Sequence, residues 1–338
     1  MDPLTHGMIG LALSTFSGQS VSISNPIALG CAIGAMIPDI DSVIRLYAND
    51  ATYLKQHRGF SHSLPMLFVF SAVVATAVAF FAKVPITQIF ETIQFADLFR
   101  PDHFAAIWLW SFLGALSHTV FDMLNSYGAM LLRKKRKLNL LTLYDPVIAI
   151  LGIGLIFQRQ INWEWNLVAV LLFSLYMLFR HRFRKHAAVD LSTHSDFVGE
   201  IQHIAVLPAL TAFYRWDFIV TTDAYTYVGK YNQWSKGVRV IERFDAQCPQ
   251  HRETFDQTAL GEYFNDFSPY LHVVHAQEGN AVTMRVIDLR YYVRNRFLHQ
   301  ATLVVDKRSG KIHQSVLHPY GHHRSVAFDE SKTQAMAS

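Results

Sequence analysis

The sequence predicts an α-helical multi-pass membrane domain followed by a soluble domain of mostly antiparallel β structure (α+β). Hydrophobic residues make up 51% of the 338 residues and charged residues only 17%, and the long uncharged runs all lie before residue 190. The chain after that point is rich in Val, Thr and Tyr with partial alternation, which favours strands. The predicted domains are residues 1–186 in the membrane, 190–328 as the soluble domain, and 329–338 as a disordered polar tail.

The same composition excludes several classes of protein. Abundant apolar side chains exclude a disordered or collagen-like chain, and the two distant cysteines, Cys31 and Cys248, cannot form a disulfide framework. A formal charge of +4 without a basic, aromatic-rich face does not indicate a nucleic-acid-binding protein. Residues 1–6 contain no Lys or Arg, so we expect no cleaved signal peptide.

Three apolar runs account for the predicted membrane spans. Residues 64–82 carry no charge and match the ~20 residues that cross a ~30 Å hydrocarbon layer. Residues 104–132 are the second run, in which His118 and Asp122 are the notable ionisable side chains, and residues 166–179 are the third. A shorter run, 146–157, precedes the third, and we expect the two to form a hairpin that turns around residues 162–166.

Two further apolar pieces, residues 7–16 and 26–38, are too short for simple spans. We expect half-helices, tilted helices or re-entrant segments there. Basic runs at residues 133–137 and 180–185 follow two of the spans, which predicts that both runs and the C-terminal domain are cytoplasmic.

The soluble domain is predicted from its strand-like segments. They are residues 218–231, 238–244, 281–289 and 297–306, with a turn at 306–311 and a helix around 252–267. Its aromatic residues are typical of sheet packing.

His and Asp recur at short spacings in the membrane half. The four groups are Asp2 with His6, Asp39 with Asp41, His57 with His62, and His118 with Asp122. His118 and Asp122 are four residues apart, so a helix places both on one face, where they can bind a metal or simply hydrogen-bond each other. An ionisable pair inside an apolar run is costly and usually serves a function. Asp39 and Asp41 alone are equally consistent with a turn or a helix cap.

The predicted topology brings the four groups to one depth near the cytoplasmic surface, which favours a shared metal site. Neutral imidazoles and carboxylates suit zinc, manganese or iron, and the set is larger than one tetrahedral ion needs, so two or more divalent ions fit. Arg58 is suited to grip an anionic substrate, although an arginine there also suits contact with lipid phosphate.

The segments THG (5–7), PDID (38–41), HRGFSHS (57–63) and HTVFDMLNSYG (118–128) resemble the motifs of the YdjM-like membrane-bound metal-dependent hydrolases. The resemblance covers residues 1–179. It implies a bacterial inner-membrane location and a distant similarity to the zinc-dependent phospholipase C and single-strand nuclease superfamily. The residues that match as ligands are His6, Asp39, Asp41, His57, His62, His118 and Asp122, whereas Asn125, Tyr127 and Gly128 are expected to shape the site.

The predicted function is a membrane-bound hydrolase that cleaves a phosphoester or phosphodiester with a metal-activated water. The expected catalytic residues are Asp41, Arg58 and Asp122, with an Asp outside direct ligation orienting the water or accepting its proton. Expected partners are membrane lipids and a small-molecule or lipid-linked phosphoester, and no nucleic acid. A metal transporter or metal-sensing scaffold is the alternative, and a membrane anchor for an interaction module is a third.

Overall fold

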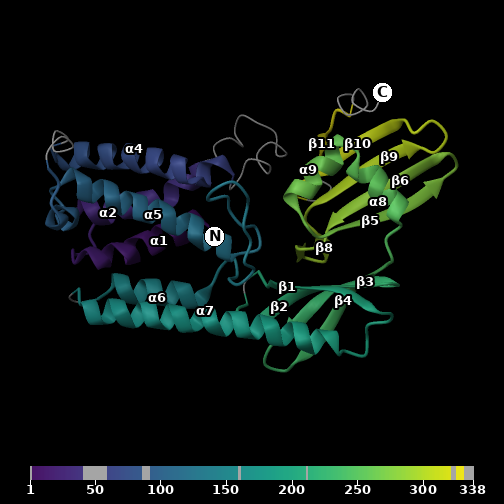
Figure 1. Cartoon of the computed structure of the whole chain (residues 1–338), viewed down its shortest axis with the longest axis horizontal. Coiled ribbons are helices and arrows are strands. Elements are labelled where there is room, and N and C mark those ends of the chain that lie inside the picture. Colours follow the sequence, from purple (N-terminus) through teal and green to yellow (C-terminus); the bar gives the residue numbers. More distant parts are fainter. Residues whose placement is uncertain are drawn as a thin grey trace. The chain divides into compact units, whose positions relative to one another are not determined.

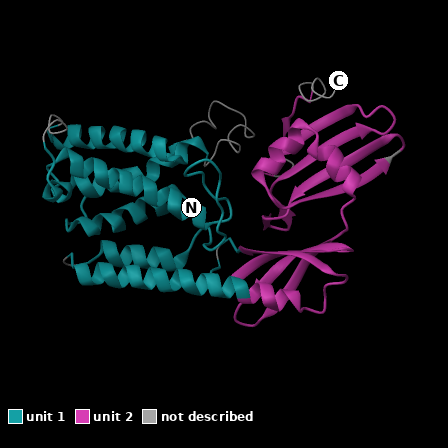
Figure 2. Cartoon of the chain, in the orientation of Figure 1, with its two compact units in different colours: residues 1–43, 57–185, 208–214 teal, residues 44–56, 186–207, 215–338 magenta. Residues whose placement is uncertain are grey.

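The computed structural model describes residues 2–40, 59–85, 92–158, 161–210, 212–320 and 325–330. These residues form two compact units, coloured separately in Figure 2. The first unit holds the helices up to Lys185 together with Pro208–Tyr214, and the second holds His186–Leu207 and the chain from Arg215 onward.

The first unit is built from helices, which Figure 1 shows lying side by side. They are α1 (Pro3–Ser14), α2 (Pro26–Met36), α4 (Leu64–Ala82), α5 (Phe104–Leu124), α6 (Pro146–Ile156) and α7 (Trp163–Ser192), with short 3-10 turns η1 (Thr15–Ser17), η3 (Phe60–His62) and η5 (Phe95–Phe99). In the described part of the chain, α4, α5 and α7 are long and apolar enough to cross a membrane. Pro26 and Pro146 occupy the first turns of α2 and α6, where their missing N–H costs nothing.

Two helix ends differ from the sequence prediction. Helix α5 ends at Leu124 and not at 132, because Asn125 takes an extended conformation and its side-chain oxygen accepts hydrogen bonds from the N–H groups of Tyr127 and Gly128. Helix α7 begins at Trp163, so the turn of the α6–α7 hairpin precedes residues 163–166.

Small residues let α2 pack very closely against α1 and α5. A Cβ atom added at Gly34 would lie 2.2 Å from the backbone oxygen of Ser111, and one added at Gly114 would lie 2.2 Å from the backbone oxygen of Cys31. On α1, a Cβ at Gly10 would lie 2.6 Å from the same Cys31 oxygen. Backbone contact of this kind is typical of helix pairs in membranes, and here it sets the distance between the ends of these helices.

The second unit contains the sheets. Strands β1 (Ile201–Pro208), β2 (Arg215–Thr222), β3 (Tyr225–Asn232) and β4 (Gly237–Asp245) form one sheet in that order. A second sheet has the order β11 (Val326–Ala327), β10 (Ile312–His318), β9 (Gln300–Asp306), β6 (Ala281–Asp288) and β5 (Leu271–Glu278), with antiparallel pairs throughout. Strands β7 (Tyr292–Val293) and β8 (Arg296–Phe297) form a small antiparallel ribbon. Helices α8 (Pro249–Asp256) and α9 (Ala259–Phe267) contribute Phe255 and Phe264 to the core that contains Met284 and Leu303.

The antiparallel β character of the C-terminal part is confirmed, but three details were not predicted. Residues 218–231 form parts of two strands, because Thr222 Oγ1 accepts hydrogen bonds from the N–H groups of Ala224 and Tyr225 and closes a tight turn. Strands β1, β5, β7 and β11 were missed. The single helix expected around 252–267 is two helices, since Thr258 caps α9 through a hydrogen bond from the Gly261 N–H.

Candidate metal centre

Four helix ends meet at one end of the first unit, and each brings a His or an Asp. His6 lies in the first turn of α1, and Asp39 follows the end of α2. His62 ends η3, two residues before the start of α4, and His118 and Asp122 occupy the last two turns of α5. Two helices therefore start at this end and two stop there, so residues far apart in sequence become neighbours.

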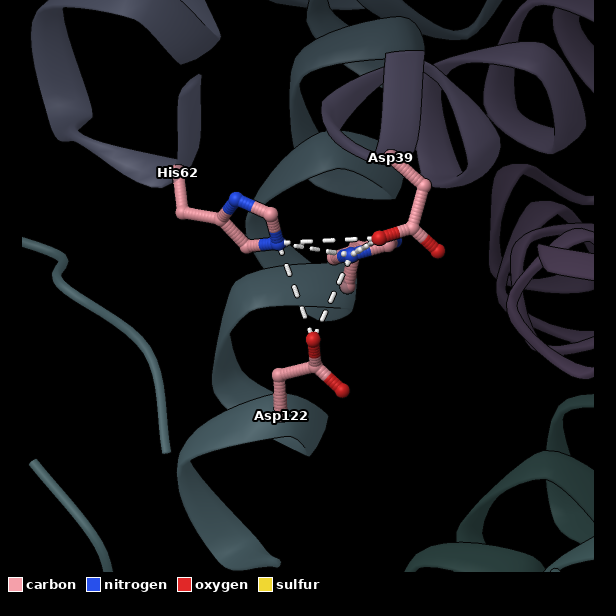
Figure 3. Close-up of side chains that lie close together, drawn as sticks. Asp39, His62 and Asp122 are labelled. Carbon is pink, nitrogen blue, oxygen red and sulfur yellow. Dashed lines mark hydrogen bonds and ion pairs between the residues drawn. The ribbon is translucent and has the colours of Figure 1, made fainter. Parts of the chain in front are cut away.

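Asp39, His62, His118 and Asp122 each offer one ligand atom to a common point, and these atoms all lie within 4.8 Å of one another. The Nε2 atoms of His62 and His118 are 3.0 Å apart, and Asp122 Oδ2 lies 3.6 Å from each of them. Asp39 Oδ1 lies 3.5 Å from His118 Nε2 and 3.9 Å from His62 Nε2. Figure 3 shows the labelled side chains pointing toward one another. Ligands around a tetrahedral ion with bonds of ~2.0–2.1 Å are separated by about 3.3 Å, so the group has the right size.

The hydrogen bonds behind the rings turn both Nε2 atoms into this group, and the bond of His118 also fixes the position of its proton. His118 Nδ1 lies 2.7 Å from the backbone oxygen of Ala35, which can only accept, so Nδ1 carries the proton and donates it. In the neutral ring His118 Nε2 then presents its lone pair to the group, which is the arrangement that metal-binding histidines adopt. On His62, Nδ1 lies 2.9 Å from Ser61 Oγ, again leaving Nε2 to face inward.

Burial makes a cation favourable at this position. The side chains of His62, His118 and Asp122 are fully buried, and Asp39 is 7% exposed. Asp39 Oδ1 accepts no hydrogen bond from the described residues, and its ion-pair partners among them are the two imidazoles and no Lys or Arg. A buried carboxylate oxygen without a donor is expensive, and a divalent cation between Asp39 and the two rings would satisfy it.

His6 approaches the group from the other side of Asp122. Its Nε2 atom lies 3.3 Å from Asp122 Oδ1, and its ring stacks on His118 with the centroids 3.7 Å apart. His6 is fully buried, and neither ring nitrogen hydrogen-bonds to another described residue. Asp122 thus directs Oδ2 toward the four-residue group and Oδ1 toward His6 and Asn125.

The structure brings together five of the predicted ligands: His6, Asp39, His62, His118 and Asp122. Asp41, His57 and Arg58 lie outside the described residues. Asp2 has another role, because its Oδ1 accepts a hydrogen bond from the Thr5 N–H and caps α1.

Three neighbouring groups orient the ligands. Asn125, which the motif resemblance placed near the site, donates from Nδ2 to Asp122 Oδ1 at 3.1 Å. Ser61 lies within the HRGFSHS segment but carried no separate prediction. The role of the Ala35 carbonyl was not predicted. Every residue carries a backbone oxygen, so no sequence pattern shows which one accepts the hydrogen bond from His118.

Comparisons with known proteins match two separate parts of the chain. A model of the YdjM inner membrane protein family matches residues 1–187, which include all five gathered residues. A model of the YfhP C-terminal alpha/beta plait domain matches residues 252–324, which contain the last five residues of α8, all of α9 and most of the five-stranded sheet. The uncharacterized protein YfhP of Bacillus subtilis (strain 168) is 26% identical over 317 residues, covering 88% of this chain and 89% of the relative. No solved structure matches the chain.

Proposed function

Because the chain belongs to the YdjM inner membrane protein family, we propose that it is a membrane-bound, metal-dependent hydrolase of phosphoesters or phosphodiesters. One observation carries this proposal: Asp39, His62, His118 and Asp122 converge from three separate segments into a buried group whose ligand atoms lie within 4.8 Å. A mixed nitrogen and oxygen set suits zinc best among the ions considered, and manganese or iron next.

Each residue of the group has a definite role in the proposal. His62 and His118 supply nitrogen ligands, and Asp39 and Asp122 supply oxygen ligands. His6 and the second oxygen of Asp122 would hold a further ion. Asn125 and the Ala35 carbonyl fix the orientation of Asp122 and His118, which keeps the donor atoms in place without substrate.

In the proposed reaction a water oxygen forms a bond to phosphorus while the ester P–O bond breaks. One water proton passes to the departing alcohol oxygen, and the other stays on the new phosphate or passes to solvent. Bound divalent cations would acidify the attacking water and offset the negative charge that develops on the phosphoryl oxygens. We assign the role of proton acceptor to Asp41, because both oxygens of Asp122 serve as ligands in this proposal, and Arg58 is proposed to hold the substrate anion.

We further propose that α4, α5 and α7 cross the membrane, with the metal-centre end of the helices and the C-terminal domain on the cytoplasmic side. The support is the hydropathy of these helices and the basic residues that follow α5 and lie in the second half of α7.

The test uses full-length protein purified in detergent. Metal content is measured by mass spectrometry, and hydrolysis is measured with the chromogenic diester bis-p-nitrophenyl phosphate. Asp122→Asn removes the bridging charge with little change in volume, and Asp102→Asn is its matched control, an exposed carboxylate outside the group that pairs with Arg100. We expect bound metal and hydrolysis in the wild type and in Asp102→Asn, and a loss of both in Asp122→Asn.

Two outcomes contradict the proposal. Protein without stoichiometric metal after growth in zinc-supplemented medium would show that the group is a structural hydrogen-bonded cluster. Metal that is retained without hydrolysis of diesters or monoesters would favour the transporter or sensor alternative.

A further inference from the structure

A basic hairpin follows the metal centre directly in the chain. Residues 129–136, which we call the basic hairpin, are closed by backbone hydrogen bonds in both directions between Ala129 and Arg136, of 3.2 and 3.0 Å. Gly128 starts the turn with a positive φ of 72°, and a Cβ atom there would lie 2.4 Å from the backbone oxygen of Arg136. Glycine is therefore needed for the chain to fold back at this point.

The basic hairpin is fixed to the metal centre at two points. Asn125 bonds Asp122 through Nδ2, and its Oδ1 accepts from the N–H groups of Tyr127 and Gly128 at 2.9 and 3.1 Å. The second point is Leu64, two residues after His62. Its N–H donates to the backbone oxygen of Leu131 in the hairpin at 2.8 Å. The position of the hairpin is thus set by the same segments that carry the ligands.

The tip of the basic hairpin presents positive charge that no described carboxylate neutralises. Arg133, Lys134 and Arg136 are exposed, and none forms an ion pair with an acidic residue in the described part of the chain. The chain leaving the hairpin is held by α7, since Arg184 donates to the Leu138 oxygen at 2.8 Å and Arg180 donates to the Leu140 oxygen at 2.7 Å. Positive charge of this kind attracts phosphate.

Large apolar side chains are exposed beside the same ligands. Leu4 is 77% exposed two residues before His6, and Phe60 is 69% exposed two residues before His62. On the basic hairpin itself, Leu132 is 66% exposed next to Arg133. We call Leu4, Phe60 and Leu132 the apolar rim. Exposed apolar groups mixed with basic ones are typical of segments that lie in the interfacial layer of a membrane, where head groups and the first methylenes meet.

We propose that the basic hairpin binds the phosphate of an anionic lipid head group while the apolar rim contacts its glycerol and upper acyl region, so that the substrate class is a lipid phosphate presented from the adjoining leaflet. Arg133 can hold two phosphate oxygens through its planar guanidinium, and Lys134 adds a point charge. The hydrolysis of that lipid rests on the proposed function, but its binding does not.

The experiment measures lipid binding to full-length protein in neutral detergent micelles containing a fluorescent phosphatidic acid. Unlabelled phosphatidic acid, phosphatidylcholine and glycerol 3-phosphate serve as competitors. The variant Arg133→Gln/Lys134→Gln is compared with Arg182→Gln/Lys185→Gln, which removes the same two charges from exposed positions on α7. We expect the hairpin variant to bind phosphatidic acid at least about tenfold more weakly and the α7 variant to stay within twofold of the wild type. Phosphatidylcholine and glycerol 3-phosphate should compete poorly.

A second pair of variants tests the apolar rim. Both substitutions lie outside residues 129–136, so neither changes a residue of the basic hairpin. Phe60→Ser should weaken phosphatidic acid binding severalfold, whereas Phe81→Ser, which changes an 81% exposed phenylalanine at the other end of α4, should not. Equal losses in both charge variants would overturn the proposal, because the basic residues would then act only through net charge. Competition by glycerol 3-phosphate as strong as that by phosphatidic acid would also overturn it, in favour of a soluble phosphate.

The binding assay is repeated on protein stripped of metal by a chelator, which separates this inference from the proposed function. Lipid binding that survives with no hydrolysis of any substrate refutes only the proposed function. Hydrolysis of the soluble diester without selective phosphatidic acid binding refutes only the lipid inference.

Discussion

The Nε2 atoms of His62 and His118 face each other at 3.0 Å, although 56 positions separate the two residues in the chain. Because the neutral ring of His118 donates its Nδ1 proton to the Ala35 oxygen, its lone pair lies on Nε2 and is directed at His62. Two arrangements satisfy that lone pair: a hydrogen bond donated by His62, or a cation shared by both rings. The nearby Asp39 and Asp122 carboxylates favour the cation, since two buried negative charges then acquire a counter-charge.

Zinc should therefore stabilise the folded protein. We expect a chelator to lower the melting temperature of the wild type by several degrees and zinc to restore it, since a ligand at 100 times its Kd contributes about 2.7 kcal/mol. Differential scanning fluorimetry in detergent measures this shift. His62→Ala should melt at the same temperature with and without zinc, and a wild type indifferent to both reagents would speak for the hydrogen-bonded pair.

Asp122 should control two ions, and His6 only one. His6→Gln is expected to leave one ion bound, because the four-residue group keeps all its donors, whereas Asp122→Asn should reduce binding at both positions. The diester hydrolysis rate should fall at least about 100-fold in Asp122→Asn, since the loss of a ligand exceeds the 10–100-fold effect typical of an orienting partner. Zinc titration by calorimetry gives the stoichiometry, and retention of two ions in His6→Gln would rule out the bridge.

The close packing of α2 on α5 should be essential to the site. In Gly114→Ala the new methyl group would lie 2.2 Å from the Cys31 backbone oxygen, so the helices must separate, at a cost of about 1–3 kcal/mol. We expect a lower melting temperature together with weaker metal binding, because Asp39 moves with α2 and His118 with α5. Gly154→Ala on α6 is the control: a Cβ atom there meets nothing within 4 Å, so stability should be unchanged or slightly improved. If Gly114→Ala is destabilised but binds zinc with unaltered affinity, the close packing of α2 on α5 does not set the positions of the ligands.

The C-terminal unit should lose stability in mild acid. Burial lowers the pKa of His299 to about 4, with Arg290 adding to this effect and Asp288 opposing it. Burial also lowers the pKa of His272 to about 4, against an opposing effect of Asp245. The unfolded chain, with imidazole pKa values near 6.5, binds these protons more readily than the folded one. The stability that neutral imidazoles provide is thus fully present above pH 6.5 and is lost as the pH falls toward 4, by about 3 kcal/mol for each histidine.

Hydrogen exchange resolved by peptide is the suitable measurement, because it reports on β5 and β9 separately from the helices. Protection there, corrected for intrinsic exchange, should decrease between pH 6.5 and 4.5. His299→Gln, which retains a donor for the Pro319 oxygen, should reduce the dependence, and His313→Gln at an exposed position should leave it unchanged. A flat profile in the wild type would show that these histidines are protonated in the fold at no cost.

Much of this architecture could be predicted from local patterns. The uncharged run of residues 64–82 coincides with α4, because the length and hydropathy of an apolar helix depend only on its own residues. The spacing of His118 and Asp122 also predicted their position correctly, because residues four apart lie on one face of any helix. Other elements depended on interactions that such patterns do not contain. Helix α5 ends early because of the Asn125 side chain, and residues 218–231 divide because Thr222 bonds backbone N–H groups beyond it.

By itself, then, the sequence determined which residues could bind metal and which segments suit a membrane, since residue chemistry and hydropathy are properties of single segments. The tertiary structure alone decided that Asp122 turns one oxygen to His118 and the other to His6, that the Ala35 carbonyl sets the proton position on His118, and that the basic hairpin lies beside them. These relations follow from how closely α1, α2 and α5 approach through Gly10, Gly34 and Gly114. That distance is set jointly by several backbones, so no single segment encodes it.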